Sequence, residues 1–514
     1  MKIVLRPRRG LVVLALSAAA AVPALAQPLR VVNWNISNYS GGRAADLQTA
    51  IFGEYQGRSM APDIIICEEF TSQNAVDFFL AVLNSTGPAD WAAAPFINGP
   101  DSDTAFFYRT SRVELLPPYV TVVAVGGPSP NHPRNIQRYD IRPVGYSGPG
   151  ATIAMYGSHM KAQESGTDDD ARRLLEAQRI VADALSLPAG WHFLLGGDLN
   201  VQSSFEQAYV TLAGPAGPFG DPIRSPGAWN NNINFRFIHT QDPSGSGGMD
   251  DRHDQILLSH SLLDGDGFDY IGSLTTPYST TTWDDPNHSY RAWGNDGTSF
   301  NSPLTVAGNQ MVGPVIAQAL KNVATPAGGH LPVFLDLRLP PKIETDAVID
   351  FGQVPQGAAA EAVLTVANAG DVSLWTEAGL ADLRYSLEAT PGFQVPPGAF
   401  IEPPGGGANL HIIAMDTATP GPRSGLLTIT SNAPDTPVLT VQLTGMVLAA
   451  GGCSADWDNN GLVNSSDISA FLSDWLQSVA GGSLVADYDG DLTVTSSDIS
   501  VFLTDWLAQV GGDC

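Results

Sequence analysis

A segment of twelve residues occurs twice near the C-terminus, and it limits what the last part of this chain can fold into. Ser465–Leu476 reads SSDISAFLSDWL and Ser496–Leu507 reads SSDISVFLTDWL, so ten of twelve positions are identical at an offset of 31. The spacing of the apolar residues predicts two equivalent amphipathic helices. The last 62 residues contain ten Asp and no Lys, Arg or Glu. This density of negative charge favours bound cations over an unfolded tail.

A loop of alternating oxygen-bearing residues precedes each copy. Positions 1, 3, 5, 9 and 12 of the first loop are Asp456, Asp458, Asn460, Asn464 and Asp467. The same positions of the second loop are Asp487, Asp489, Asp491, Thr495 and Asp498. Hard oxygen ligands on a twelve-residue loop that leads into a helix suit Ca²⁺. The second loop departs from the pattern because Leu492 stands where the first has the turn glycine, Gly461.

At these residues the segment 453–514 resembles a type I dockerin, a small α-helical module with EF-hand-like calcium loops. The resemblance implies bound Ca²⁺ and docking onto a cohesin-like domain of a scaffold or cell-surface protein. The alternative is that the module only stabilises or anchors the C-terminus.

The N-terminus has the pattern of a secretory signal peptide over residues 1–26. Lys2, Arg6, Arg8 and Arg9 precede the apolar run 11–22, and Ala24-Leu25-Ala26 before Gln27 fits a cleavage site. The apolar run is shorter than the ~20 residues that a membrane span needs, and no other segment predicts a transmembrane helix. We therefore expect a secreted or cell-surface protein. In an oxidising compartment, Cys453 and Cys514 are expected to form a disulfide.

The chain is strongly acidic, with 25 Lys and Arg against 52 Asp and Glu and a formal net charge of -27. This balance argues against a nucleic-acid reader with a basic stripe. It does not exclude an enzyme that meets phosphate groups through metal ions.

The middle of the chain, residues 344–448, alternates short strands with Gly and Pro turns and follows a predicted linker at Pro340-Pro341. This texture predicts an all-β sandwich. The segments DFGQVPQG and LTVANAGD resemble immunoglobulin-like sandwiches of the choice-of-anchor kind, which implies a spacer or adhesive module.

Residues 27–339 alternate short β-branched strands with polar loops and a few helical patterns, as α/β domains do. The clearest elements are strands at Leu29–Trp34, Asp63–Cys67, Thr152–Ser158 and His192–Leu195 and a helix at Thr167–Leu187. Polar residues stand at the strand ends, where α/β sheets place ligands. They are Asn35, Glu69, His159, Asp198, Asn200, Asp254 and His330. This set suits metal-assisted attack on phosphate.

Each residue type has a role in such chemistry. The Glu69 carboxylate can bind a divalent cation, which neutralises charge on phosphate, while Asn35 supplies a neutral oxygen or orients a water. Asp198 and Asn200 can position the attacking water or bind a second cation.

The histidines can transfer protons near neutral pH. Asp254 can hold His330 in the correct tautomer.

The motifs WNI, CEEF, SHMK, GDLN, RHDQIL and HLPV occur in the order found in the endonuclease/exonuclease/phosphatase superfamily, and the segment resembles its DNase I-like members. The resemblance implies a four-layer α/β sandwich, a Mg²⁺ or Mn²⁺ ion and hydrolysis of phosphoester bonds. It makes Asn35 and Glu69 metal-binding residues and Arg142 a substrate-phosphate contact. It makes the other five strand-end residues catalytic: His159, Asp198, Asn200, Asp254 and His330.

One departure concerns the residue before His330. The superfamily usually has Asp there, and this chain has Gly329. Asp250, Asp251 or Asp296 is expected to substitute if the site is active.

Three hypotheses follow. The first is a secreted, metal-dependent endonuclease or phosphodiesterase that acts on nucleic acid. The second keeps the chemistry and replaces the substrate with a phospholipid or another phosphoester. The third is a surface binding or adhesion protein whose catalytic domain is weakened by Gly329.

Overall fold

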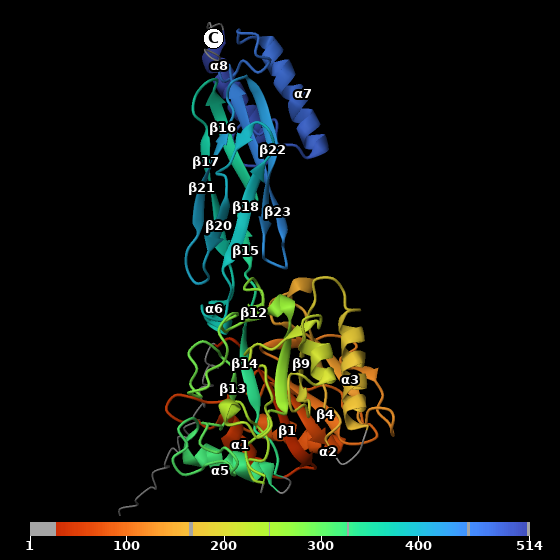
Figure 1. Cartoon of the computed structure of the whole chain (residues 1–514). Coiled ribbons are helices and arrows are strands. Elements are labelled where there is room, and N and C mark those ends of the chain that lie inside the picture. The colour runs from red at the N-terminus through yellow and green to blue at the C-terminus, as the bar shows by residue number, and fades with distance from the viewer. Residues whose placement is uncertain (1–26, 164–167, 246, 326–327, 450–452, 511–514) are drawn as a thin grey trace, which may run out of the picture.

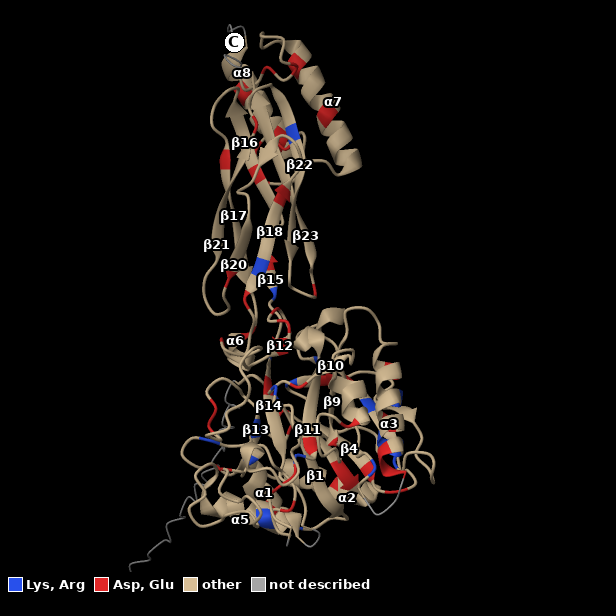
Figure 2. Cartoon of the chain, in the orientation of Figure 1, with Lys and Arg blue, Asp and Glu red and all other residues tan. Residues whose placement is uncertain are grey.

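A computed structural model describes residues 27–163, 168–245, 247–325, 328–449 and 453–510. The predicted signal peptide and Cys514 lie outside the described residues. Figure 1 shows a broad α/β part that contains the N-terminal half of the chain, an elongated all-β part above it and a helical part at the far end. Acidic residues are spread over all three parts, whereas basic residues are sparse (Figure 2). No helix of the described residues is long and apolar enough to cross a membrane.

The α/β part contains two seven-stranded sheets. The first has the order β12-β14-β1-β2-β4-β3, with β13 also paired to β14. Its strands are β1 (Leu29–Tyr39), β2 (Ile64–Phe70), β3 (Trp91–Ala93), β4 (Asp103–Arg109), β12 (Asp269–Tyr270), β13 (Arg291–Ala292) and β14 (Val333–Arg338). The second has the order β10-β11-β9-β8-β7-β5, with β6 also paired to β7. Its strands are β5 (Val113–Leu115), β6 (Thr121–Ala124), β7 (Ile136–Pro143), β8 (Ile153–Gly157), β9 (His192–Asp198), β10 (Phe219–Gly220) and β11 (Asp254–Ser259).

Five α-helices and three short 3₁₀ turns complete this part among the described residues. The helices are α1 (Ala44–Phe52), α2 (Gln73–Leu83), α3 (Asp169–Ala184), α4 (Gln207–Ala213) and α5 (Gly313–Ala324), and the turns are Pro149–Ala151, Ile233–Phe235 and His260–Leu262. Buried residues of α1, α2 and α5 pack on the outer face of the first sheet. Those of α3 and α4 join the core of the second sheet. The predicted α/β sandwich is therefore confirmed.

The central strand β1 shows why the two sheets stack. Val31 belongs to the core between the sheets, and Val32 and Trp34 belong to the core under the helices. Because side chains alternate along a strand, an apolar run like this one is buried on both faces. The same alternation gives Asn33 and Asn35 the inner face, so polar side chains enter the interior at one end of the strand.

Two further sheets follow the α/β part. A four-stranded sheet has the order β15-β17-β21-β19, and a five-stranded sheet has the order β16-β23-β22-β18-β20. Their strands are β15 (Ile343–Thr345), β16 (Val348–Pro355), β17 (Glu361–Asn368), β18 (Leu383–Ala389), β19 (Phe393–Gln394), β20 (Ala399–Glu402), β21 (Asn409–Met415), β22 (Gly421–Ser431) and β23 (Val438–Leu448). Both sheets contribute to one apolar core.

Both prolines of the predicted linker, Pro340 and Pro341, are buried. A one-turn helix between β17 and β18, α6 (Val372–Trp375), packs into the core of the α/β part. Trp375 is 1% exposed there, and the Arg112 guanidinium lies 3.8 Å from its ring centre. The all-β part is thus joined to the α/β part by shared core packing, which composition alone could not reveal.

The last part contains the two predicted helices, α7 (Ser465–Gly481) and α8 (Ser496–Gln509). Phe471 and Phe502, which occupy equivalent positions of the repeat, stack with ring centres 4.1 Å apart. The indole of Trp475 donates to the Thr495 carbonyl at 2.7 Å, and that of Trp506 donates to the Asn464 carbonyl at 2.8 Å. The duplicated sequence therefore makes duplicated contacts, each helix bonding to the N-cap residue of the other.

Candidate active site

The seven strand-end residues predicted from the sequence meet at one edge of the paired sheets. Strand β1 runs parallel to β2, and β8 runs parallel to β9, so the C-terminal ends of each pair lie together. Asp254 begins β11 directly opposite Asp198 at the end of β9. Each of the seven residues has a side-chain or backbone contact with another, as given below.

Asn35 holds two carboxylates together. Its side-chain NH₂ group donates to Glu69 Oε1 and to Asp198 Oδ2, both at 3.0 Å. Its side-chain oxygen accepts the backbone N–H of Ser37 at 3.0 Å. Asn35 therefore orients both carboxylates in this arrangement, and its oxygen keeps a second lone pair. The role of Asn35 as a metal ligand stays a prediction.

Glu69 is aimed at this edge by its backbone. Its φ of +63° lies in the left-handed region, which non-glycine residues adopt at a cost of about 1–3 kcal/mol. Glu69 Oε2 also accepts the backbone N–H of Asn38 at 2.6 Å. Residues held in such a conformation cluster at functional sites.

His330 is paired with Asp254. Its Nδ1 lies 2.8 Å from Asp254 Oδ2, and its Nε2 lies 3.6 Å from Asp198 Oδ2. The hydroxyl of Thr240 donates to the same Asp254 oxygen at 2.6 Å. Burial alone lowers the pKa of His330, but Asp254 and Asp198 outweigh it and raise that pKa to about 10. His330 is therefore a cation at neutral pH, with one ring N–H fixed by Asp254 and the other directed at Asp198.

His159 lies on the other side of Asp198. Its Nε2 is 3.4 Å from Asp198 Oδ2, and its Nδ1 is 3.8 Å from Glu69 Oε1 without a hydrogen-bond partner. Burial lowers the pKa of His159 well below its ordinary value, and the nearby positive charge of Arg134 lowers it further. The two histidines that flank Asp198 therefore differ in charge at neutral pH.

Asn200 completes the turn after β9. Its φ is +52°, its backbone N–H donates to Asp198 Oδ1 at 3.2 Å, and its side-chain NH₂ group donates to the Met160 carbonyl at 3.2 Å. Asn200 thus fixes the loop that carries His159 relative to Asp198.

The donor set fits a hard divalent cation. Asp198 and Glu69 share a single amide donor, and both oxygens of the neighbouring Glu68 carboxyl are buried without a partner. Burial raises the pKa of Glu68 well above its ordinary value, and the charges of Asp254 and Asp198 raise it further. A cation bound through the partly exposed Glu69 would offset this excess of negative charge. Glu68 lies in the CEEF motif but is not among the residues predicted for the site, although strand alternation places it on the inner face with Ile64 and Ile66.

The glycine in place of the expected Asp has a structural reason. Gly329 has a φ of +68°, and a Cβ there would lie 2.6 Å from the Ala324 backbone at the end of α5. Of the expected substitutes, Asp296 accepts hydrogen bonds from Thr298 and Gln310 in its own loop. Asp242 instead packs beside Gly328, and burial raises the pKa of its carboxyl although the positive charge of His330 opposes the rise. Asp242 is therefore the carboxylate next to the glycine pair, and the sequence did not single it out.

Arg142 is the one predicted site residue that the structure does not bring to the cluster. In the strand register, Arg142 lies opposite Glu114 at the far end of β7. Gln137, five positions earlier, lies opposite Gly157 at the end near the site. Arg134, in the loop before β7, lies nearer the cluster, because it donates to the Met160 carbonyl at 3.4 Å and its charge acts on His159. The sequence placed Arg142 at a strand but gave no information on which end of the sheet it occupies.

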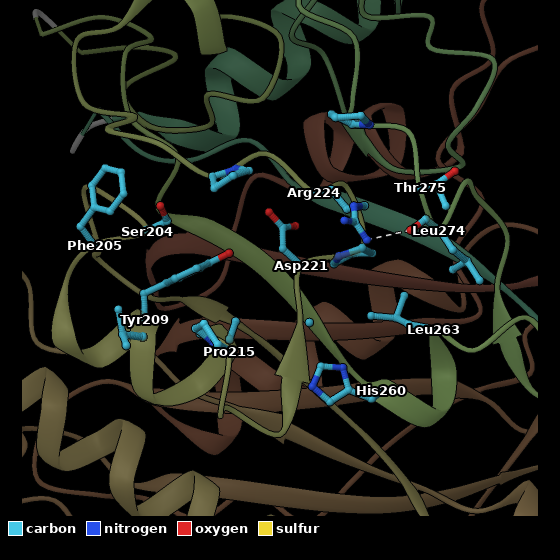
Figure 3. A pocket seen from close by; sticks show the side chains of 17 residues that line it. Ser204, Phe205, Tyr209, Pro215, Asp221, Arg224, His260, Leu263, Leu274 and Thr275 are labelled. Atoms are coloured by element: carbon cyan, nitrogen blue, oxygen red, sulfur yellow. Dashed lines mark hydrogen bonds between the residues drawn. The ribbon is translucent and has the colours of Figure 1, made fainter.

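A cavity of about 750 Å³ lies on the α4 side of the second sheet (Figure 3), and none of the seven cluster residues lines it. Phe205, Tyr209, Leu263 and four prolines give this cavity a mostly apolar lining. Phe205 is 71% exposed and stands five residues after Asn200 in the chain.

The two acidic loops of the helical part each gather three carboxylates. Asp456, Asp458 and Asp467 lie together, as do Asp487, Asp489 and Asp491. Asp467 and Asp498 each accept the N-cap backbone N–H of their helix. Gly461 has a φ of +85° and Leu492 a φ of +65°, so Leu492 adopts the conformation that a turn glycine normally supplies. Cys453 is disulfide-bonded.

No protein-family model matches this chain, and no curated protein matches it. Solved structures are similar to this chain over about 60% of its length. An endonuclease/exonuclease/phosphatase from Bacteroides vulgatus is 12% identical over 61% of this chain and 99% of its own, with a TM-score of 0.38. TDP2 from D. rerio, solved with a single-strand DNA product, is 12% identical over 60% and 98%, with a TM-score of 0.35. A beta toxin from Staphylococcus aureus is 14% identical over 60% and 99%, with a TM-score of 0.34. Residue roles in this chain rest on its own geometry, because similarities this weak transfer none.

Proposed function

We propose that this chain is a divalent-cation-dependent phosphodiesterase of the endonuclease/exonuclease/phosphatase type, with nucleic acid as its substrate. The observation that carries the proposal is the charged His330–Asp254 pair directed at Asp198, which shares the Asn35 amide with Glu69. A fixed cation and a metal ion held by a carboxylate can stabilise the charge that develops on phosphate, and a buried carboxylate can orient the attacking water.

The position of each residue sets its proposed role. Glu69 would hold Mg²⁺ or Mn²⁺, and the ion would neutralise charge on the phosphate oxygens. Asp198, held by Asn35 and flanked by both histidines, orients the attacking water and accepts its proton. His330, protonated and fixed by Asp254, donates a hydrogen bond to the phosphate or a proton to the leaving oxygen.

The other parts of the chain complete the proposal. The predicted signal peptide supports export, and the two acidic loops support Ca²⁺ binding. The immunoglobulin-like and dockerin-like assignments support a role of the C-terminal half in attachment to a cohesin-like or cell-surface partner.

A phospholipid head group is the second candidate substrate. The exposed ring of Phe205, five residues after Asn200 in the chain, lines the apolar cavity of Figure 3. An acyl chain would need such a surface, whereas a nucleic-acid strand would not.

Nicking of supercoiled plasmid by residues 27–514 tests the proposal. We expect nicking with Mg²⁺ or Mn²⁺, none with chelator, and at least a hundredfold loss in His330→Ala. His260→Ala is the matched control, because His260 bonds to the Gly217 carbonyl outside the cluster. Hydrolysis of sphingomyelin but not of plasmid would replace the nucleic-acid substrate with lipid. Inactivity on both and on bis(p-nitrophenyl) phosphate would reject the enzyme in favour of a binding protein.

A further inference from the structure

A second cavity, of about 880 Å³, lies away from the catalytic cluster. Its volume is within the range of about 300–1,000 Å³ that small-molecule sites occupy. Arg30 and Asp336, which face each other across β1 and β14, form part of its wall. Arg30 precedes Asn35 by five positions on β1, about 16 Å at ~3.3 Å per residue. Arg30 also shares the outer face of the sheet with Val32 and Trp34, whereas Asn35 faces inward, so cavity and cluster are separate.

The lining of this cavity is unusual for so acidic a chain. Four of the 25 Lys and Arg residues line it, against two acidic residues. The arginines are Arg30, Arg58, Arg109 and Arg291, and the acids are Asp284 and Asp336. Five aromatic side chains complete the wall: Phe52, Trp91, Trp283, Trp293 and Phe334.

Three of the arginines have acidic partners. Arg30 makes two hydrogen bonds to Asp336, at 2.7 and 2.8 Å. Arg109 contacts Asp90 at 3.1 Å and Asp63 at 3.6 Å. Arg291 contacts the exposed Asp284 at 3.3 Å. Their charges are therefore largely balanced before any ligand binds.

Arg58 is different. Its hydrogen bonds go to the carbonyls of Gln310 and Met311 and to the side-chain oxygen of Gln56, all uncharged. Among the described residues it has no carboxylate within ion-pair distance. Its guanidinium lies 5.2 Å from the ring centre of Trp283, which is half-buried in the wall. The cavity thus presents an uncompensated cation beside an aromatic face.

We propose that this cavity is a nucleotide-binding site distinct from the catalytic cluster. The base packs against the aromatic rings of the wall, and the Arg58 guanidinium beside Trp283 binds the phosphate. Aromatic platforms combined with cationic side chains are the common means of holding single-stranded nucleic acid, and arginine suits both phosphate and stacking. The choice of a nucleotide over other planar anions rests on the proposed nucleic-acid substrate.

Calorimetric titration of the full chain with adenosine 5′-monophosphate tests the site. We expect one saturable site in buffer with Ca²⁺, and weaker binding of adenosine and of inorganic phosphate, since each offers half of the interaction. Arg58→Gln and Trp283→Ala should each weaken binding at least tenfold. Arg236→Gln is the matched control, because the Arg236 guanidinium stacks at 4.4 Å on Phe237 outside the cavity and its loss should change nothing.

The remaining arms separate the possible outcomes. Titration of His330→Ala with a single-stranded oligonucleotide distinguishes a strand from a free nucleotide as the ligand. If the oligonucleotide binds more tightly than adenosine 5′-monophosphate, the site is assigned to a nucleic-acid strand. Absence of saturable monophosphate binding, or wild-type affinity in folded Arg58→Gln, would overturn the proposal. Binding without hydrolysis of bis(p-nitrophenyl) phosphate would reject the proposed function and keep this site, whereas hydrolysis without binding would do the reverse.

Discussion

At the scale of single residues, the charge of His330 controls the chemistry that the cluster can perform. Two buried carboxylates lie within 3.6 Å of its ring nitrogens and raise its pKa to about 10. A histidine with an ordinary pKa near 6.5 would be mostly neutral at pH 8 and could not serve as an acid there.

Hydrolysis should therefore persist into the alkaline range and decline as the pH passes about 10. Asp254→Asn removes the partner of Nδ1, so the decline should move toward the ordinary histidine range. Rates on bis(p-nitrophenyl) phosphate between pH 6 and 11 check this shift. An unchanged alkaline limb would contradict the assignment of His330 as the acid.

The same pair affects stability. Because the folded pKa of His330 is raised above the unfolded value, its contribution to the free energy of unfolding is complete below about pH 6.5 and is lost as the pH rises through about 10.

Gly329→Asp tests whether the superfamily's usual carboxylate can be restored. We expect a loss of about 2–4 kcal/mol in the free energy of unfolding and no gain in activity, because the φ is +68° and a Cβ would lie 2.6 Å from Ala324. Gly308→Asp is the control, with a φ of +84° and open space, and should lose only about 1 kcal/mol. Chemical denaturation measures both. A more active and equally stable Gly329→Asp would contradict this interpretation.

At the scale of elements, the two acidic loops place different residues in the same left-handed turn. Leu492 holds a φ of +65° at the position where Gly461 holds +85°. Leu492→Gly removes a strain of about 1 kcal/mol and should tighten Ca²⁺ binding by the second loop several-fold. Gly461→Leu should weaken the first loop by a similar factor, since no neighbouring atom lies within 4 Å of the added Cβ. Ca²⁺ titration monitored by tryptophan fluorescence measures both variants. An unchanged Ca²⁺ affinity of Leu492→Gly would contradict the inferred strain at Leu492.

Elements with strong local signals were predictable from the sequence. The repeat predicted both helices, and the buried strands β1, β2, β8 and β9 were found within a few residues of their ends. The convergence of Asn35, Glu69 and Asp198 followed from strand ends. The position of Arg142 depended on which end of β7 faces the site, and the positive φ of Gly329 depended on packing against α5. Neither quantity has a local sequence signature.

At the scale of the whole molecule, the all-β part is not an independent spacer. Trp375 is 1% exposed within the core of the α/β part, and Arg112 donates to the Leu374 carbonyl while stacking on the Trp375 ring. Composition suggested a boundary at the two prolines. It could not reveal that one loop of the Gly- and Pro-rich β segment packs into the core of the α/β part.

Trp375→Ala should destabilise the α/β part by about 3–5 kcal/mol, as buried aromatic deletions do. Thermal unfolding and limited proteolysis should show this loss, and residues 27–343 alone should be less stable than the full chain. Val438→Ala, an exposed change on β23, is the control. Equal stability of residues 27–343 and the full chain would show that the packing of α6 is dispensable.

The central claim is that Glu69 and the His330–Asp254 pair form one metal-dependent phosphodiesterase site. The most direct measurement is the Mg²⁺ dependence of bis(p-nitrophenyl) phosphate hydrolysis by the full chain and by Glu69→Gln. The account predicts saturable Mg²⁺ dependence in the wild type and a Mg²⁺ requirement at least tenfold higher, with a lower maximal rate, in Glu69→Gln. Hydrolysis that ignores Mg²⁺, or a Glu69→Gln variant that matches the wild type, would contradict it.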